Sequence, residues 1–401
     1  MSVFSCLETA PRDPIMGMTE AYMADPAPDK VNLGVGVYLD ETGKIPLMMC
    51  VQAVEQDLAA TRRPHGYLPM SGMAGYNTVV QELVFGPSSS AVITGRVATL
   101  QAVAGTGALR VGAGLLALAS PDSKVLLSDP SWENHDLVFT RAGFTTGTYR
   151  YYDAATRSVD IEGMLDDLRA ADPGTIVVMH ASCHNPTGCD LTHDEWDRVT
   201  EVVQERELVP FIDMAYQGLS LSVIQDMYPM TALGEAGVNF LVANSFSKNF
   251  GLYGERVGAI HFATSDSAEA TRVLSQAKIV VRSLYSNPPT QGAAIVSTIL
   301  SSRELRGIWE KELGEMRDRI KKMRAVFRSG LENAGVTQDL SYITSQAGLF
   351  SYSGLTVPQM QRLRNEFHIY GLDSGRLCVA GLNAFNMDRV IEAVSEIMKS
   401  E

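Results

Sequence analysis

The sequence predicts an α/β protein: a large domain with a mainly parallel sheet flanked by helices, a smaller α+β domain, and an N-terminal arm. Two observations lead to this prediction. Short runs rich in β-branched residues alternate with longer helical patterns over most of the chain, and most of these runs are almost continuously apolar. Strands of a parallel sheet have this composition because helices cover both faces of the sheet.

The predicted elements follow from these patterns in chain order. Strands are expected at 97–104, 124–128, 175–180, 208–212, 240–244 and 257–262. Helices are expected between them at 108–119, 192–206 and 267–281. Open parallel sheets bind ligands in the loops at the carboxyl ends of their strands, so candidate site residues are expected in those loops.

The domain prediction divides the 401 residues into three parts. Residues 1–40 contain four prolines and are expected to form an extended arm and the first part of the small domain. Residues 41–300 hold the alternating pattern and form the large domain. Residues 301–401 form the rest of the small domain, with a long charged helix at 304–334, a strand near 348–352, a helix at 357–367, a segment at 376–380 and a final helix.

Composition excludes several classes of partner. A net charge of −13 repels phosphate backbones, so no nucleic acid is expected as a partner. No apolar run approaches the ~20 residues that a membrane-spanning helix needs, and the acidic N-terminus resembles neither a signal nor a transit peptide. Five cysteines without a regular spacing indicate a reducing compartment, so a cytoplasmic protein is expected.

The sharpest motif surrounds Lys248. It lies just after the predicted strand 240–244, with Ser245 and Ser247 before it and Arg256 eight residues after it. A lysine amine becomes a nucleophile that forms imines when burial or a nearby cation lowers its pKa. Taken alone, Lys248 is better explained as a surface residue of a loop. With the two hydroxyls and the arginine, which suit a phosphate ester, an imine-forming lysine is the better interpretation.

Two further motifs fit a flat, phosphorylated cofactor. Asp213 ends an apolar strand, where it would pair with a protonated ring nitrogen, although a turn or helix-cap aspartate is the commoner explanation for such a residue alone. Gly105 and Thr106 lie in a turn of small residues that opens a helix, where free N–H groups bind phosphate. The turn lacks the third glycine of a dinucleotide fingerprint and the Gly-Lys-Ser/Thr of a Walker loop.

A histidine-rich segment invites a metal interpretation, which we reject. Three histidines and two cysteines lie between residues 180 and 193, without paired Cys-x-x-Cys spacing. We therefore expect no metal and interpret Asn185 as an amide presented by a rigid Asn-Pro-Thr-Gly turn. Trp132, in another loop after a strand, would either stack on a cofactor ring or belong to the core.

Together these motifs resemble those of a known family. Over essentially its whole length the chain is similar to the aspartate and aromatic amino acid aminotransferases, class I enzymes of fold type I that use pyridoxal 5′-phosphate. The resemblance rests on the lysine segment together with segments 32–38, 286–289 and 374–376, which occur in the family's order. It implies that the large domain, 41–300, binds the cofactor.

The resemblance implies a role for each candidate residue. Lys248 would form the imine and then move the proton, Asp213 would pair with the pyridine nitrogen, and Tyr216 would contact the phenolic oxygen. The remaining cofactor contacts would come from Asn185 at the same oxygen, Trp132 on the ring, His135 and His180 beside Asp213, and Gly105, Thr106, Ser245 and Arg256 at the phosphate, with Tyr67 from the partner subunit.

The resemblance also implies where substrates bind. Arg376 would hold the substrate α-carboxylate through a bidentate fork, with Gly36, Asn185 and Trp132 nearby. Arg282 of the partner subunit would meet the distal carboxylate of aspartate or glutamate. Two contributions from the partner imply an obligate homodimer with two shared sites.

The residues expected to govern substrate specificity resemble two different types of family member. Leu39, Ile45 and Gly66 make the entrance more apolar, as in members that act on aromatic substrates. Val37, Thr106 and Asn287 resemble the aspartate-selective type instead. Gly254 and Cys378 replace asparagines that are frequent in relatives, which puts the local hydrogen bonding in doubt but not the chemistry.

The expected reaction is reversible amino-group transfer between aromatic or dicarboxylic L-amino acids and 2-oxo acids such as 2-oxoglutarate or oxaloacetate. The main alternative is an aspartate-dominant aminotransferase. Remote alternatives are a lyase or decarboxylase of the same fold, and a non-catalytic cofactor-binding regulator. Arg282 and Arg376, the two arginines expected to bind substrate, argue against most lyases and decarboxylases of this fold. The chain also has no segment that resembles the DNA-binding module that a cofactor-binding regulator needs.

Overall fold

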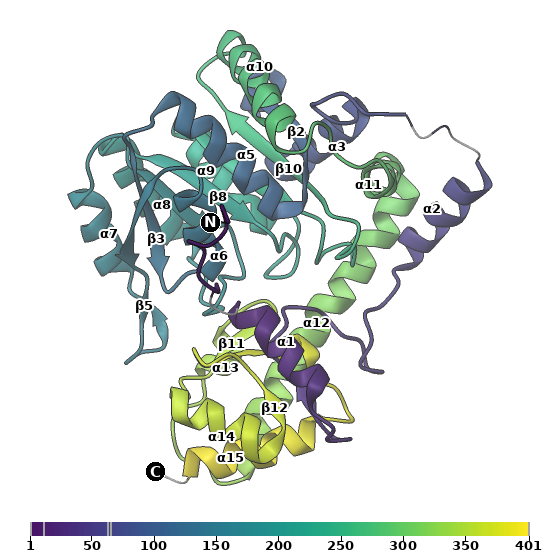
Figure 1. Ribbon diagram of the computed structural model, residues 1–401, viewed down its shortest axis with the longest axis vertical. Coiled ribbons are helices and arrows are strands. Elements are labelled where there is room, and N and C mark those ends of the chain that lie inside the picture. Colours follow the sequence, from purple (N-terminus) through teal and green to yellow (C-terminus); the bar gives the residue numbers. More distant parts are fainter. Residues whose placement is uncertain (1, 11–12, 62–63, 65, 400–401) are drawn as a thin grey trace.

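The computed structural model describes the chain except residues 1, 11–12, 62–63, 65 and 400–401, so part of the predicted arm lies outside the described residues. It shows the predicted α/β architecture, with a seven-stranded sheet at its centre (Figure 1). The strand order is β2-β10-β9-β8-β7-β3-β4. Only β10 runs antiparallel to its neighbours, so the sheet is mainly parallel.

Six of the seven strands lie at the predicted positions. They are β2 (Val97–Val103), β3 (Lys124–Asp129), β7 (Ile176–His180), β8 (Val209–Met214), β9 (Phe240–Ser245) and β10 (Val257–Ala263). The seventh, β4 (Thr145–Arg150), was not predicted. Its sequence TTGTYR is mostly polar, because β4 is the edge strand and four of its six residues are exposed.

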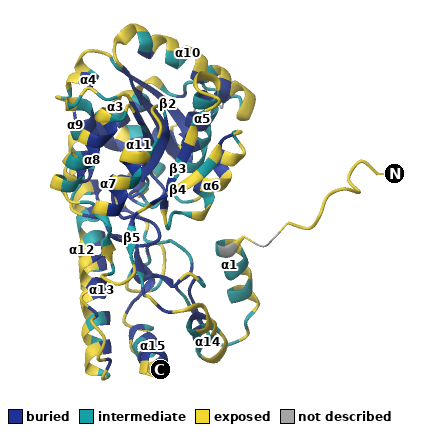
Figure 2. Cartoon of the chain, turned by 90° about the vertical axis from the view of Figure 1, so that its left-hand side faces the viewer, coloured by how far each residue is buried: buried dark blue, intermediate teal, exposed yellow. Residues whose placement is uncertain are grey.

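Helices cover both faces of this sheet and leave its central strands buried (Figure 2). On one face lie α5 (Ala104–Ala119), α6 (Glu133–Thr140) and α10 (Ser267–Leu284). On the other lie α3 (Ala74–Phe85), α7 (Ile161–Ala170), α8 (His193–Glu205), α9 (Tyr228–Glu235) and α11 (Gln291–Ser301), and α2 (Met49–Ala60) packs against α11 farther from the strands. The two cores fix the strand ends, from which the site loops start.

Helix boundaries follow local capping signals. Thr192 and Glu195 form a capping box at the start of α8, and the Asp266 carboxylate accepts the Glu269 N–H at the start of α10. Helix α5 begins four residues before the predicted start, so Gly105 and Thr106 form its first turn. Short elements, namely α4 (Ser90–Ile93), β5 (Tyr152–Asp153), β6 (Ser158–Val159) and a 3₁₀ turn (Gln225–Met227), complete this region.

The C-terminal elements form a second group below the sheet (Figure 1). The long helix α12 (Arg303–Asn333) extends from the sheet into this group. The group contains α13 (Tyr342–Ser345), β11 (Phe350–Tyr352), α14 (Val357–Phe367), β12 (Ile369–Tyr370), β13 (Arg376–Cys378), a 3₁₀ turn (Val379–Gly381) and α15 (Met387–Lys399).

The N-terminal segment joins this group. Strand β1 (Val31–Asn32) pairs in parallel with β12, and α1 (Pro14–Ala24) lies beside it. The Asp25 carboxylate, at the end of α1, accepts hydrogen bonds from the rings of His368 and Tyr370. Before α1, the chain leads away from the body and exposes Val3, Phe4 and Leu7 (Figure 2). Among the described helices, none has the length and apolar character needed to cross a membrane.

Candidate active site

The carboxyl ends of the central strands open into a cavity of roughly 200 Å³. Twelve of the residues predicted to form the site line it: Gly36, Gly105, Thr106, Trp132, His180, Asn185, Asp213, Tyr216, Ser245, Lys248, Arg256 and Arg376. They come from the large sheet, from the segment after β1 and from β13, so the cavity lies between the two groups of elements. The structure thus brings together residues up to about 340 positions apart.

Lys248 follows β9 and presents its amine to the cavity. The Nζ atom lies 5.2 Å from the centroid of the Tyr216 ring. Burial lowers the pKa of Lys248 to about 8, although the nearby Asp213 carboxylate opposes this shift and the cations of Arg256 and Arg376 reinforce it. A substantial neutral fraction near neutral pH makes this amine a nucleophile, which an exposed lysine is not.

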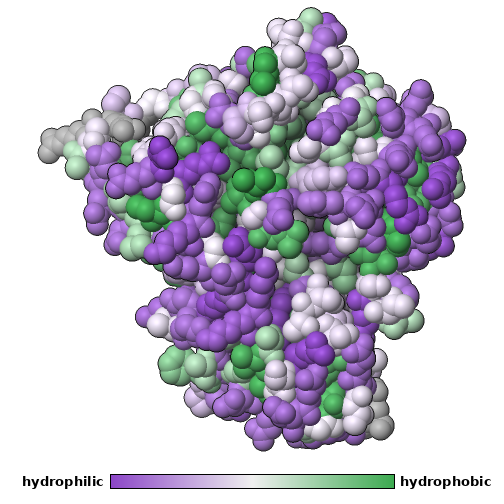
Figure 3. Space-filling view, turned by 180° about the vertical axis from the view of Figure 1, so that it is seen from behind, coloured by the Kyte–Doolittle hydropathy of each residue, from purple (hydrophilic) through white to green (hydrophobic). Residues whose placement is uncertain are grey.

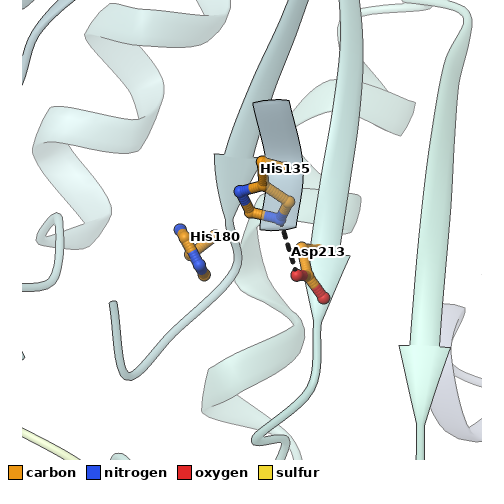
Figure 4. Close-up of side chains that lie close together, drawn as sticks. All are labelled: His135, His180 and Asp213. Carbon is orange, nitrogen blue, oxygen red and sulfur yellow. Dashed lines mark hydrogen bonds and ion pairs between the residues drawn. The ribbon is translucent and has the colours of Figure 1, made fainter. Parts of the chain in front are cut away.

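Asp213 lies at the end of β8 with one oxygen bonded and one free. Its Oδ2 accepts a hydrogen bond from His135 Nε2 at 2.9 Å, and Oδ1 has no partner among the described residues (Figure 4). Burial raises the pKa of Asp213, but the hydrogen bond and charge of His135 outweigh that effect and leave the pKa below its ordinary value. The free oxygen of a buried carboxylate can therefore receive a cationic N–H from the cavity.

His135 and His180 surround Asp213, and the three groups are close enough to hold a metal ion. The hydrogen bonds of His135 favour another explanation, because Nδ1 contacts Ser131 Oγ at 2.9 Å while Nε2 contacts Asp213. Burial and the neighbouring His135 lower the pKa of His180 to about 3, so His180 is neutral. This arrangement orients and holds the Asp213 carboxylate.

The other histidines of the rejected metal motif are bound elsewhere. His184 contacts Ser128 and Thr187 through its two ring nitrogens. His193 stacks on Tyr228 with the ring centroids 3.8 Å apart. Neither belongs to the group around Asp213.

Arg376 is almost completely buried at 1% exposure, yet its guanidinium is only partly bonded. Its two terminal nitrogens donate to Asn185 Oδ1 at 2.9 Å and to the Gly34 carbonyl at 2.8 Å, while Nε has no partner among the described residues. The guanidinium carbon lies 4.2 Å from the centroid of the Phe350 ring. A buried cation with unused hydrogen-bonding capacity fits a carboxylate ligand.

The start of α5 offers an anion site on the opposite side of the cavity. Gly105 and Thr106 lie in its first turn, where backbone N–H groups lack helical acceptors. A Cβ at Gly105 would lie 3.3 Å from the Ser245 Cβ, so the turn packs tightly against the end of β9. Ser245 and Ser247 contact each other at 3.2 Å, and Arg256, whose guanidinium donates to the Tyr253 carbonyl, adds positive charge.

Trp132, predicted to stack on a cofactor ring, precedes α6. Its indole lines the cavity and meets the His135 ring edge-on, with the centroids 5.3 Å apart. Cys378 and Gly254, which replace asparagines frequent in relatives, have simple local environments. Cys378 is buried and its thiol donates to the Val37 carbonyl, and a Cβ at Gly254 would meet no atom within 4 Å.

Three predicted site residues do not line the cavity of this chain: His135, Tyr67 and Arg282. His135 is buried and is connected to the cavity through its hydrogen bond to Asp213. Tyr67 is 93% exposed, and Arg282, near the end of α10, bonds only to Ser286 Oγ among the contacts described for its guanidinium. Sequence reasoning also missed Ile15 and Phe350, which do line the cavity. These two are apolar and carry no chemical signal, and their positions depend on how α1 and β11 fold back over the sheet.

A family model described as "Aminotransferase class I and II" matches residues 28–394. The chain belongs to this family. The aminotransferase is 50% identical over 398 residues to an aspartate aminotransferase of Pseudomonas aeruginosa, covering 99% of this chain and all of the relative. It is 44% identical over 399 residues to the aromatic-amino-acid aminotransferase of Escherichia coli, again covering 99% of this chain and all of the relative.

Solved structures agree with the fold of the aminotransferase. An aromatic-amino-acid aminotransferase from Burkholderia pseudomallei, covalently bound to pyridoxal phosphate, is 52% identical and superposes with a TM-score of 0.97, covering 99% of this chain and all of that one. An aromatic amino acid aminotransferase from Psychrobacter, cocrystallised with aspartic acid, is 41% identical and also reaches a TM-score of 0.97, with 99% and 100% coverage. The family and fold predicted from the sequence are thus confirmed.

Proposed function

We propose that this aminotransferase moves the amino group between aromatic or dicarboxylic L-amino acids and 2-oxo acids such as 2-oxoglutarate or oxaloacetate. The observation that carries the proposal is the placement of Lys248. Its amine, whose pKa burial lowers to about 8, shares one cavity with the free oxygen of Asp213 and the partly bonded guanidinium of Arg376. These groups offer an imine-forming amine, a counter-charge for a cationic ring, and an anchor for a carboxylate.

Pyridoxal phosphate fits this cavity and is the proposed cofactor. Lys248 would hold its aldehyde carbon, Asp213 its ring nitrogen, and Asn185 and Tyr216 its phenolic oxygen. Trp132 would cover the ring, and Gly105, Thr106, Ser245 and Arg256 would hold the phosphate. When bound, the cofactor supplies an electron sink that stabilises negative charge at the substrate Cα.

The residues of this chain then have distinct tasks. Arg376 binds the substrate α-carboxylate and orients the Cα–H bond, with Asn185 and Gly36 shaping that end of the cavity. The Lys248 amine takes the proton from Cα and later returns one to the product. His135, with His180 beside it, keeps the Asp213 carboxylate ionised and aimed at the ring nitrogen.

We also propose a homodimer in which each site takes Tyr67 and Arg282 from the partner subunit. The exposure of both residues supports this, since neither lines the cavity of its own chain. Large apolar side chains are exposed in the segment leading into α2 and on α10, which carries Arg282: Ile45, Leu47, Met49, Ile279 and Leu284. Hydrophobic side chains also gather toward the middle of the back of the molecule (Figure 3). Exposed groups of this kind mark association surfaces.

Subunit mixing tests the shared site. Arg282→Ala and Lys248→Ala subunits are each expected to lack dicarboxylate transfer. A hybrid dimer places both defects in one site and leaves the other site complete, so activity should return after the subunits exchange. Absence of any recovery, once exchange has been verified by mass spectrometry, would rule out donation across the interface.

An aspartate-dominant enzyme is the second candidate, and the 50% identity to an aspartate aminotransferase favours it. The deciding experiment compares kcat/KM for aspartate, tyrosine, phenylalanine and alanine with one common oxo acid. We expect tyrosine or phenylalanine within about a hundredfold of aspartate, a gap below ~2.7 kcal/mol. A preference for aspartate above about a thousandfold, or ~4 kcal/mol, would establish the second candidate.

Two wider predictions accompany this function. We propose that residues 41–300 act as the cofactor-binding domain and that residues 1–40 and 301–401 form the small domain. A cytoplasmic location remains a prediction, supported by five cysteines that are all free thiols.

A further inference from the structure

Two segments that follow neighbouring parallel strands carry adjacent groups of the cavity. The segment 181–190 follows β7 and presents Asn185, while the segment 215–227 follows β8 and presents Tyr216. The strands are in register, with His180 opposite Asp213. The Ala181 N–H still donates to the Asp213 carbonyl, but beyond it no backbone hydrogen bond among the described residues joins the two segments, so other contacts must fix the distance between them.

Asp190 holds the first segment in shape. Its carboxylate accepts the backbone N–H groups of Cys183 and His184, each at 2.8 Å. Cys183 has a φ of 52°, in the left-handed region that costs a non-glycine residue free energy. Charge-assisted hydrogen bonds to two successive N–H groups stabilise that conformation and fix the backbone one residue before Asn185.

Asp226 holds the second segment in the same manner. Its buried carboxylate accepts four backbone N–H groups, from Gly218, Ser220, Leu221 and Ser222, at 2.8–3.3 Å. The first of these lies two residues after Tyr216. Each segment is therefore organised around its own aspartate.

Ser220 connects the two segments. Its hydroxyl donates to Asp190 Oδ2 at 2.8 Å, and the side chain is buried with 6% exposure. Because Asp190 fixes one segment and Asp226 fixes the backbone of Ser220, this single bond transmits the position of one segment to the other. A charged acceptor in a buried setting makes the bond strong relative to one at the surface.

We propose that Ser220 and Asp190 are positioning residues that set the spacing between Asn185 and Tyr216. This inference rests on the proposed function, in which those two residues contact the phenolic oxygen of the cofactor. Donors at that oxygen stabilise its negative charge. If the segments move apart, more of that negative charge is left uncompensated. The pKa of a proton-bearing group beside the phenolic oxygen then rises. The Ser220–Asp190 bond therefore tunes proton affinity at the centre of the site without touching the cofactor.

The test titrates the visible absorbance of the cofactor-loaded enzyme with pH. Ser220→Ala removes the bond, and Ser222→Ala is the matched control, because the Ser222 hydroxyl contacts only Gln225 within the same segment. We expect Ser220→Ala to raise the absorbance midpoint by about half a pH unit and to lower kcat about three- to tenfold. Ser222→Ala should leave both values unchanged, and Ser220→Thr, which keeps the hydroxyl, should restore them.

Asp190→Asn serves as a second variant. An amide accepts the same N–H groups more weakly than a carboxylate, so the midpoint should shift in the same direction and further, with a lower melting temperature. The ratio of kcat/KM for aspartate over phenylalanine should stay constant in both variants, because neither residue faces the side chain of the substrate.

Unchanged midpoints in Ser220→Ala and Asp190→Asn would overturn the inference, whatever their melting temperatures, and would show that the bond is only structural. Failure of the proposed function has another signature. In that case the wild-type protein itself would neither take up pyridoxal phosphate nor transfer amino groups.

Discussion

The two ends of the cavity differ in how completely one chain builds them. At the cofactor end, Asp213 is 4% exposed, Ser245 is 3% exposed, and each is held by the end of a buried strand. At the proposed substrate entrance, beyond the residues that line the cavity, Tyr67 is 93% and Ile45 is 48% exposed, in segments outside the sheet. Under the proposed homodimer, one subunit would supply the groups that carry the chemistry, whereas the choice of substrate would depend on surfaces that a second subunit completes.

Lys248→Ala should cause the largest loss, because no other group of the cavity can form an imine and move the Cα proton. We expect turnover to become undetectable and sodium borohydride to stop fixing the cofactor to the protein. Lys124→Ala is the control, since Lys124 forms only an exposed ion pair with Asp172. Turnover similar to wild type in Lys248→Ala would show that the proposed cofactor end of the cavity does not carry the chemistry.

Asp213→Ala should have the next largest effect. Without the carboxylate, a cationic ring nitrogen in a buried site loses its counter-charge, which can be worth several kcal/mol in the transition state. We expect kcat to fall well over tenfold and cofactor affinity to decrease, as measured by steady-state rates and equilibrium dialysis. A loss below tenfold, under ~1.4 kcal/mol, would contradict the assigned role.

Arg282→Ala should lower kcat/KM unequally for different substrates, and this tests the proposed role of the partner subunit at the substrate entrance. Its guanidinium has a carboxylate partner only when the substrate carries a second acid group, so kcat/KM should fall far more for aspartate than for phenylalanine. Arg272→Ala, which removes an exposed arginine from the same helix, should change neither. Equal losses for both substrates would mean that Arg282 has a structural role.

Capture of the cofactor by the cofactor-free protein should depend on pH through Lys248. Its pKa of about 8 lies below that of an ordinary lysine, so the protein holds the neutral, nucleophilic amine at lower pH than a free chain does. As pH rises from 7 to 9, the neutral fraction increases, and the rate of imine formation should rise about tenfold. A rate that keeps rising steeply above pH 9.5 would indicate an ordinary lysine.

The smallest effect is expected at the entrance. Leu39→Lys with Ile45→Thr removes apolar contacts, each buried methylene contributing roughly 0.8 kcal/mol, and adds a cation near the proposed distal carboxylate. Aspartate should gain several-fold over phenylalanine in kcat/KM, while kcat for aspartate changes little. An unchanged or reversed ratio would show that these residues do not govern selectivity.

The fold could be predicted where burial leaves a continuous apolar signal. Strands β7 to β10 are of this kind, because helices cover both of their faces. Strand β4, at one edge of the sheet, carries no such signal, since mostly exposed threonines satisfy its geometry equally well. The start of α5 was also misplaced, because a turn rich in glycine looks like a loop although it forms the first turn of the helix.

The cavity lining was predictable for charged and polar groups that follow strands, such as Lys248 and Asp213. Ile15 and Phe350 were not, because an apolar residue in a helix such as α1 or a short strand such as β11 has many possible environments. The hydrogen bond between Ser220 and Asp190 was equally hidden, since it depends on the spacing of two loops that only the folded sheet defines.

The parallel pairing of β1 with β12 constrains how the protein is made. Val31 meets Ile369, and Gly34 meets the Arg376 guanidinium, across nearly the full length of the chain. At a synthesis rate of ~10 residues per second, the ribosome needs roughly half a minute between these segments. The N-terminal strand must therefore stay unpaired during most of translation, and a nascent chain that stalls before residue 369 lacks both the partner of β1 and the arginine that donates to the Gly34 carbonyl.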